Sequence, residues 1–215
     1  MPKRATAPIG APCWVDLLTS DADRSRSFYS QLFGWKPEEP SAEFGGYFMY
    51  TLNDVPVAGC MANPPDSGMP DTWNIHLATE DARKTVDASV AEGGQIAVAP
   101  MDVGDIGTMS LVIDPGGAAI GAWQPKLFQG FGILAEAGAP SWFELHTRDY
   151  ETAVAFYRDV FHWDTKVVSD VPEFRYTTLN HGEDWLAGIE DASGFLPEGV
   201  PARWSVYFGV DDAVV

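Results

Sequence analysis

The chain has 215 residues, of which 46% are hydrophobic and 13% aromatic, a composition typical of a packed globular protein that excludes a disordered tail. Its formal net charge of −18, from 13 Lys and Arg against 31 Asp and Glu, argues against a nucleic-acid partner because a phosphate backbone would be repelled. No apolar run approaches the roughly 18–20 residues that a membrane span needs, so we expect no membrane partner.

The N-terminal segment 1–8 contains two charges but no apolar core after them, so it does not have the pattern of a signal peptide. The two cysteines, Cys13 and Cys60, each lie in an apolar stretch, which is typical of small reduced core residues. We therefore expect a cytoplasmic protein.

Residues 14–33 predict a strand followed by a helix. Side chains alternate with a period of two over 14–19, and Asp21 stands where a helix N-cap would be. Gly34 is placed to end the helix in a left-handed conformation. One apolar stripe is expected along the helix, formed by Ser25, Phe28, Tyr29, Leu32 and Phe33.

The segment 14–35 is duplicated at 142–163. The strand end, the aspartate and the aromatic positions all keep their register, which chance similarity rarely does. His162 occupies the position of Gly34, and we expect it to form a strained or exposed helix terminus. The second helix repeats the apolar stripe with Ala153, Phe156, Tyr157, Val160 and Phe161.

A related unit begins at residue 73 and has a partner at 204–212, so a β-α-β-β-β pattern is used four times. Short strands are expected at 48–52, 57–61, 109–113, 118–123, 174–179 and 185–189. The fourth unit stops after its first strand. We expect either a truncated chain or a sheet completed by another chain, and in the second case a homo-oligomer formed by strand exchange or by pairing of strand edges.

The Phe28-Tyr29 pair, the helix exit Phe33-Gly34-Trp35 and the turn at 114–118 resemble the vicinal oxygen chelate superfamily. That group includes glyoxalase I, extradiol dioxygenases and bleomycin-resistance proteins, and the chain most resembles two-module actinobacterial glyoxalase-like proteins. The resemblance covers almost the whole chain. It implies an α+β fold of tandem βαβββ modules, in which curved mixed sheets form cups with the helices outside. The first module would span 1–127 and a partial second module 138–215.

Superfamily members with chemistry hold a metal on the concave face with two His and one Glu. The resemblance places those positions on Trp14, Asn74 and Gly121, and in the second module on Trp142 and Ser205. Indole and methylene bind no metal, and an amide is a poor ligand for a transition metal. We therefore expect no cofactor and no metal at the usual positions.

Strand alternation puts Asp16 and His76 on the cup face, at matching places of neighbouring strands. We predict a carboxylate–imidazole pair that anchors a polar ligand or shuttles a proton. The alternative is a structural hydrogen bond under an apolar ligand.

Other candidates share these faces. Glu144 and His146 could form half of a displaced metal site, but two ligands are too few, so we expect a structural role. Trp14, Trp123 and Trp142, with Asn74, could line a site for planar ligands; filling of the core by the indoles is an equal alternative. His181 lies in a predicted turn and is expected to be exposed and inert.

These features favour a glyoxalase- or bleomycin-resistance-like protein that binds a small hydrophobic or aromatic molecule in its cup. The alternative is a lyase, isomerase or oxygenase of glyoxalase or dioxygenase type, which would use a relocated divalent metal site or the Asp16–His76 pair. A third possibility is a module that serves mainly in protein interactions.

Overall fold

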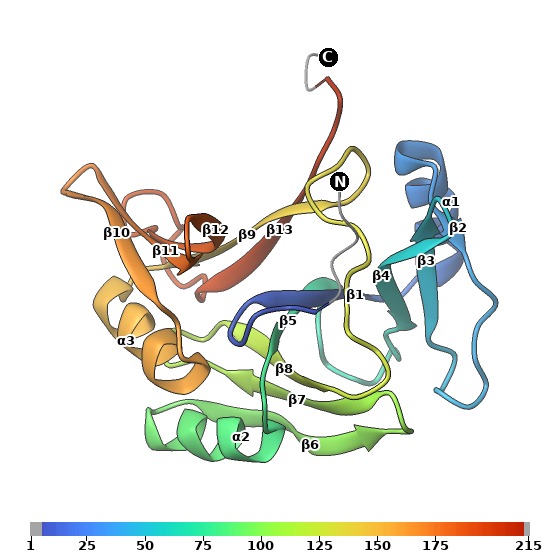
Figure 1. Ribbon diagram of the computed structural model, residues 1–215, viewed down its shortest axis with the longest axis horizontal. Helices are drawn as coiled ribbons and strands as arrows, with labels where there is room; N and C mark the ends of the chain where they lie inside the picture. The colour runs from blue at the N-terminus through green and yellow to red at the C-terminus, as the bar shows by residue number, and fades with distance from the viewer. Residues whose placement is uncertain (1–5, 213–215) are drawn as a thin grey trace.

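The computed structural model describes residues 6–212 (Figure 1). The first unit contains β1 (Pro12–Thr19), α1 (Ala22–Phe33), β2 (Lys36–Pro37), β3 (Phe48–Leu52) and β4 (Val55–Ala62). The second contains β5 (Thr72–Ala78), α2 (Ala82–Ala91), β6 (Gln95–Val103), β7 (Gly107–Ile113) and β8 (Ala119–Pro125). The third contains β9 (Pro140–Thr147), α3 (Tyr150–Phe161), β10 (Thr165–Val171), β11 (Phe174–His181) and β12 (Asp184–Asp191), and β13 (Arg203–Phe208) follows. The predicted fold class of tandem βαβββ units is confirmed.

Two mixed sheets contain these strands. The first two units share a sheet in the order β2-β3-β4-β1-β5-β8-β7-β6, and the third unit and β13 form a sheet in the order β10-β11-β12-β9-β13. In each sheet the first strands of consecutive units pair antiparallel, β1 with β5 and β9 with β13. Each of β1, β5 and β9 also pairs parallel with the last strand of its own unit. The second sheet therefore repeats the central pairing of the first.

The helix ends follow the local sequence signals. The side chain of Asp21 accepts a hydrogen bond from the backbone N–H of Arg24, as expected of an N-cap. Gly34 ends α1 with φ 71°, and His162 ends α3 with φ 58° and an exposed side chain, as its position in the repeat predicted. Within residues 6–212, no helix combines the length and apolar character needed to cross a membrane.

The apolar stripes of the two duplicated helices differ in burial. Phe156 and Val160 of α3 are each 2% exposed, whereas the equivalent Phe28 and Leu32 of α1 are 55% and 54% exposed. Figure 1 shows α3 beside α2, while α1 lies at the opposite side of the molecule with no helix of residues 6–212 against it. The same sequence pattern therefore gives a buried stripe only where a second helix covers it.

Reciprocal hydrogen bonds join the two halves of the chain. The indole N–H of Trp35 donates to the carbonyl of Gly138 (2.6 Å), and that of Trp163 donates to the carbonyl of Gly10 (2.9 Å). The two tryptophans are equivalent in the repeat, and so are the two glycines, which precede β1 and β9. Gly10 and Gly138 adopt φ values of 78° and 76°, in the left-handed region that favours glycine. Each half thus fastens the first strand of the other.

Candidate functional site

Strand pairing determines which side chains share the face predicted to form a cup. Asp16 of β1 pairs with Gly59 of β4. Trp14 of β1 pairs with His76 of β5, which pairs with Gly121 of β8. Because paired residues and residues two apart in a strand point to the same side of a sheet, all five lie on one face. We call it the cup face.

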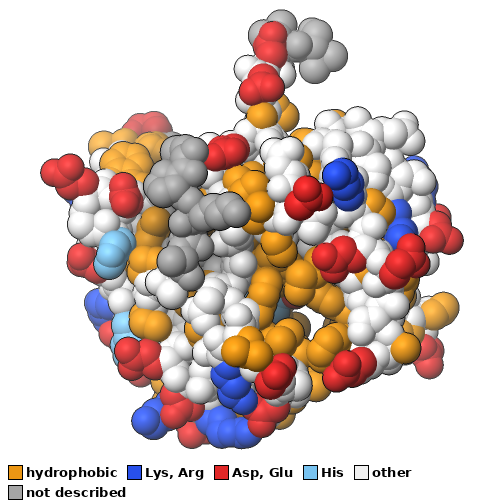
Figure 2. All heavy atoms as spheres, turned by 45° about the vertical axis from the view of Figure 1, so that its right-hand side comes forward, with side chains coloured by type: hydrophobic (Ala, Val, Ile, Leu, Met, Phe, Trp, Pro, Cys, Tyr) orange, Lys and Arg blue, Asp and Glu red, His pale blue; other side chains and the backbone are white. Residues whose placement is uncertain are grey.

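Helix α1 packs on the opposite face, where the hydroxyl of Tyr29 accepts a hydrogen bond from the indole of Trp73 (3.1 Å). The cup face is instead rich in flexible thioether side chains. Strand register places four methionines on it: Met49, Met61, Met101 and Met109. The molecular face in Figure 2 is hollowed, and hydrophobic side chains rim the hollow.

Asp16 lies at the centre of a hydrogen-bonded group on the cup face. Its Oδ2 is 2.5 Å from Nε2 of His76. Its Oδ1 accepts hydrogen bonds from the indole of Trp14 (3.0 Å) and from the hydroxyl of Tyr47. The His76 side chain is 6% exposed and that of Asp16 is 20% exposed, so the carboxylate is the part that solvent reaches. We call Trp14, Asp16, Tyr47 and His76 the first centre.

The structure thus brings the two sequence-predicted residues Asp16 and His76 into contact, while their functional role stays a prediction. The sequence analysis did not predict Tyr47 as a site residue. An equivalent tyrosine, Tyr176, is present in the second copy of the repeat. Burial and the charge of Asp16 raise the pKa of Tyr47 well above its usual range. Its hydroxyl therefore remains a neutral donor to the carboxylate.

Two glycines make room for the first centre. A Cβ at Gly59 would overlap the Tyr47 hydroxyl, and a Cβ at Gly121 would overlap the His76 ring. Side chains of the centre therefore lie directly on the backbones of the neighbouring strands β4 and β8. This close approach fixes the imidazole against Asp16.

Replacing Gly121 with alanine is expected to destabilise the protein by roughly 1–3 kcal/mol, because the new methyl group must displace the His76 ring. Chemical denaturation of the variant measures the change. Gly194→Ala is the matched control, since open space surrounds Gly194 and a Cβ there would meet nothing within 4 Å. Equal stability of the two variants would contradict the proposed overlap.

A second carboxylate that accepts hydrogen bonds from an indole and from tyrosine hydroxyls lies on the five-stranded sheet. The indole of Trp142 donates to Oε2 of Glu144 (3.1 Å), and the hydroxyl of Tyr176 donates to the same oxygen (2.5 Å). The hydroxyl of Tyr207 donates to the other oxygen, Oε1 (3.1 Å). Tyr207 pairs with Trp142 just as His76 pairs with Trp14, so it takes the place of the imidazole. We call Trp142, Glu144, Tyr176 and Tyr207 the second centre.

His146 and Glu190 extend the second centre. Nε2 of His146 is 2.9 Å from Oε1 of Glu144 and 3.4 Å from Oε2 of Glu190, which lies on β12. Burial raises the pKa of Glu144, but hydrogen bonds from His146, Tyr176, Trp142 and Tyr207 outweigh burial and lower it to about 2. Burial and the charge of Glu144 raise the pKa of Glu190. The sequence analysis named Glu144 and His146 as candidates, and the pairing of β9 with β12 adds Glu190.

The predicted aromatic walls of the cup are largely covered. Trp14 and Trp123 are only 4% and 8% exposed. Phe128, in the segment after β8, packs edge-on against the Trp14 ring at 4.8 Å, and its carbonyl accepts a hydrogen bond from the Trp123 indole (3.0 Å). Phe131 packs on Trp14 as well. Asn74 and Trp142 are half-buried, and stacking on a ligand by any of these residues stays a prediction.

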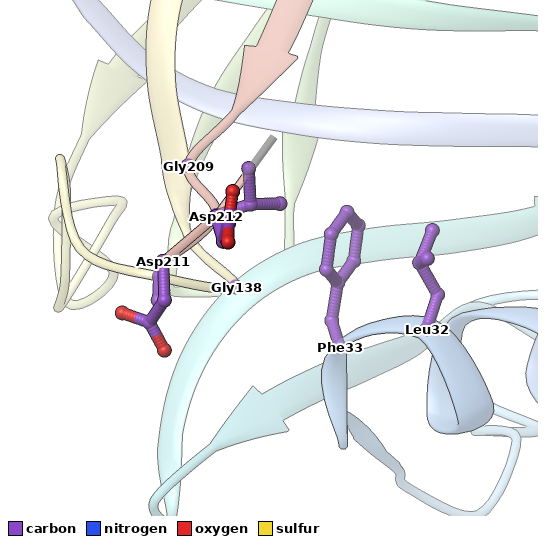
Figure 3. Close-up of a pocket in the computed structure, with 8 residues that line it drawn as sticks. Leu32, Phe33, Gly138, Gly209, Asp211 and Asp212 are labelled. Atoms are coloured by element: carbon purple, nitrogen blue, oxygen red, sulfur yellow. The ribbon is translucent and has the colours of Figure 1, made fainter. Parts of the chain in front are cut away.

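A separate groove of about 420 Å³ lies between the end of α1 and residues 209–212 (Figure 3). Leu32 and Phe33 form its apolar side, and Figure 3 shows the carboxylate of Asp211 pointing away from them. It contains neither a nucleophile nor an imidazole among its described lining residues. The chemistry of the two centres is absent from this groove.

Comparison with known proteins gives consistent matches. The family model described as the glyoxalase/bleomycin resistance protein/dioxygenase superfamily matches residues 13–121. A putative glyoxylase, CFP32, of Mycobacterium tuberculosis (strain CDC 1551 / Oshkosh) is 39% identical over 99% of this chain and 82% of its own length. The anthracycline biosynthesis protein DnrV of Streptomyces peucetius is 32% identical over 94% of this chain and 78% of its own length.

Solved structures share the fold at low sequence identity. BphC, a halotolerant catechol dioxygenase, aligns with a TM-score of 0.58 and 15% identity over 85% of this chain. The Mn(II)-bound glyoxalase from Novosphingobium aromaticivorans aligns with a TM-score of 0.56 and 19% identity, also over 85% of this chain. The chain spans 65% and 62% of those two proteins. At such identities the likeness concerns the fold alone.

Proposed function

Because the chain belongs to the glyoxalase/bleomycin resistance protein/dioxygenase superfamily, we propose that it binds an apolar or aromatic small molecule on its cup face, over the Asp16–His76 pair. The binding would not use the metal triad usual in the superfamily. The observation that carries the proposal is the Asp16 carboxylate, which is fixed by three donors and partly exposed on a face otherwise rich in methionine.

The chemistry of the cup face suits such a ligand. Met61 and Met101 are 42% and 50% exposed, and unbranched thioethers adapt to apolar ligands of varied shape. A hydroxyl or ammonium group of the ligand could donate to Asp16, whose orientation is set by His76 and Tyr47. One polar anchor in an apolar cup is the usual plan of a small-molecule site.

The names of two relatives support an aromatic ligand. DnrV and the Streptomyces sp. (strain C5) protein DauV, which is 34% identical over 69% of this chain, are both named anthracycline biosynthesis proteins. Anthracyclines are planar and polycyclic with several hydroxyl groups, which matches a cup with an apolar floor and a carboxylate anchor. We use an anthracycline as the probe ligand.

The superfamily's metal does not fit the positions where its ligands would stand. The nitrogen of Trp14 is a donor that is bonded to Asp16, and Asn74 offers only an amide. Gly121 has no side chain, and the His76 ring fills the space above it. The proposed function therefore contains no metal step at the first centre.

Replacing His76 with glutamine is expected to weaken binding of the anthracycline probe about 10- to 100-fold, because Asp16 loses the charge-assisted partner that orients it. Isothermal titration calorimetry measures the change. His181→Gln is the control, since His181 is exposed on the other sheet and should leave the affinity unchanged. Unchanged affinity in His76→Gln would make the pair purely structural, and no binding by the unmodified protein would overturn the proposal.

A further inference from the structure

We propose that Glu144, His146 and Glu190 bind one divalent first-row transition metal ion on the five-stranded sheet. This inference concerns a different sheet from the proposed ligand site and does not depend on it. The three residues each offer one ligand atom, and these atoms all lie within 4.8 Å of one another.

The spacing of the ligand atoms fits a single ion. Metal bonds to imidazole nitrogen and carboxylate oxygen are about 2.0–2.2 Å long, so two ligands at tetrahedral or octahedral angles stand about 3–3.5 Å apart. Nε2 of His146 is 2.9 Å from the Glu144 oxygen and 3.4 Å from the Glu190 oxygen. Both imidazole–carboxylate distances therefore suit one ion, and the two carboxylate oxygens, which lie within 4.8 Å of each other, would close on it by side-chain rotation.

Hydrogen bonds from His146 alone do not satisfy both Glu144 and Glu190. A neutral imidazole has at most one proton on Nε2, so it can donate to only one of the two carboxylates that Nε2 faces. His146 is 7% exposed, and its Nδ1 is buried with no hydrogen-bond partner within residues 6–212. Among residues 6–212, no Lys or Arg forms an ion pair with Glu144 or Glu190. A divalent cation would supply the missing positive charge.

Glu144 is already oriented for metal binding. Its Oε2 accepts hydrogen bonds from Trp142 and Tyr176, and its Oε1 accepts one from Tyr207 and faces Nε2 of His146. Partners that orient a ligating carboxylate in this way raise metal affinity, because less freedom is lost on binding. The Glu190 side chain is 22% exposed, so solvent reaches this side of the group.

The first centre provides an internal comparison. Leu18 pairs with Met61 in β1 and β4, just as His146 pairs with Glu190 in β9 and β12. The positions that hold an imidazole and a carboxylate in one sheet are therefore apolar in the other. Metal binding is accordingly expected on the five-stranded sheet and not at Asp16.

The chemistry of the three ligands restricts which metal ions would bind. One imidazole with two carboxylates suits Zn²⁺, Co²⁺, Mn²⁺ or Fe²⁺, whereas Ca²⁺ requires six to eight oxygens. Three protein ligands leave at least one position for water or another small ligand. Zn²⁺ and Co²⁺ are the practical probes, since Co²⁺ in a protein site has a visible absorption spectrum.

The test is calorimetric titration of chelator-treated protein with Zn²⁺ and Co²⁺, together with the Co²⁺ spectrum. We expect one ion per chain, with an affinity weakened about 100-fold or more in both His146→Gln and Glu190→Gln. Glu190→Gln changes a partly exposed side chain and tests the site even if His146→Gln fails to fold.

Two matched variants complete the test. His181→Gln, at an exposed histidine, and His76→Gln, at the first centre, should both keep the metal affinity of the unmodified protein. No saturable binding by the unmodified protein, or equal affinity in Glu190→Gln, would overturn the metal site. His76→Gln should bind the anthracycline more weakly and keep the metal affinity, so failure of either proposal is recognised separately.

Discussion

Replacing Trp163 with alanine is expected to lower the free energy of unfolding by about 3–5 kcal/mol. The Trp163 ring is 3% exposed and packs against the rings of Tyr157 and Trp204 at centroid distances of 5.2 and 6.0 Å. Its N–H donates to the carbonyl of Gly10, before β1. The alanine variant loses this packing, opens a cavity and leaves a buried carbonyl without its donor.

Urea denaturation followed by circular dichroism measures the loss and avoids dependence on indole fluorescence. Trp163→Phe retains most of the ring and should lose only about 1 kcal/mol with the hydrogen bond. Trp185→Ala is the control, because Trp185 is 51% exposed and its removal should change the stability little. A cost for Trp163→Ala no greater than that for Trp185→Ala would mean that the two halves are not fastened through this residue.

Replacing Asp114 with alanine is expected to cost roughly 2–5 kcal/mol of stability. Asp114 is 3% exposed in the turn between β7 and β8. Its Oδ1 accepts from the backbone N–H of Ala118 (2.8 Å), and its Oδ2 accepts from the hydroxyl of Tyr157 (3.0 Å), which in turn accepts from the Trp204 indole (2.7 Å). The change leaves two buried donors unsatisfied at roughly 1–3 kcal/mol each.

Thermal and urea denaturation test this cost. The control is Asp105→Ala, since Asp105 is exposed in the turn between β6 and β7. If Asp114→Ala were as stable as Asp105→Ala, the hydrogen bonds from Trp204 through Tyr157 to Asp114 would not contribute to holding the two sheets together.

Asp114 also predicts a pH dependence. Burial raises the pKa of Asp114 above its ordinary 3.8, although hydrogen bonds from Ala118 and Tyr157 act in the opposite direction. The folded protein therefore holds this proton more tightly than the unfolded chain. Its contribution to stability is complete below pH 3.8 and decreases as the pH rises through the raised pKa of the folded state.

The comparison variant for the pH dependence is Asp114→Asn, which does not titrate. The stability of the unmodified protein minus that of Asp114→Asn should decrease as the pH rises from about 3.8. Unfolding free energies at several pH values measure this difference. A difference that grew with pH would mean that the hydrogen bonds outweigh burial and that the pKa is lowered.

The sequence by itself determined the repeat and the local structure. The capping aspartates Asp21 and Asp81, Gly34 and the period of two in β1 are local signals, because capping and alternation depend on residues close in the chain. Asp149 stands at the start of α3 as the repeat predicts, but its side chain makes no capping hydrogen bond. Matching positions in equivalent strands also placed Asp16 and His76 on one face, and the structure puts them 2.5 Å apart. Strands β2, β6 and β10 were not located, because β2 has only two residues and the other two are largely exposed and show little apolar alternation.

Only the tertiary structure decided which distant residues complete each centre. Tyr47 lies directly before β3 and reaches Asp16 because β3 pairs with β4 and β4 with β1, while Glu190 reaches His146 because β12 pairs with β9. Local periodicity does not encode this register. The covering of Trp14 by Phe128 depends on how the segment after β8 folds back. Burial of α3 but not of α1, despite the same stripe, follows from α2 lying beside one of them. Packing between segments far apart in the chain decided each of these features.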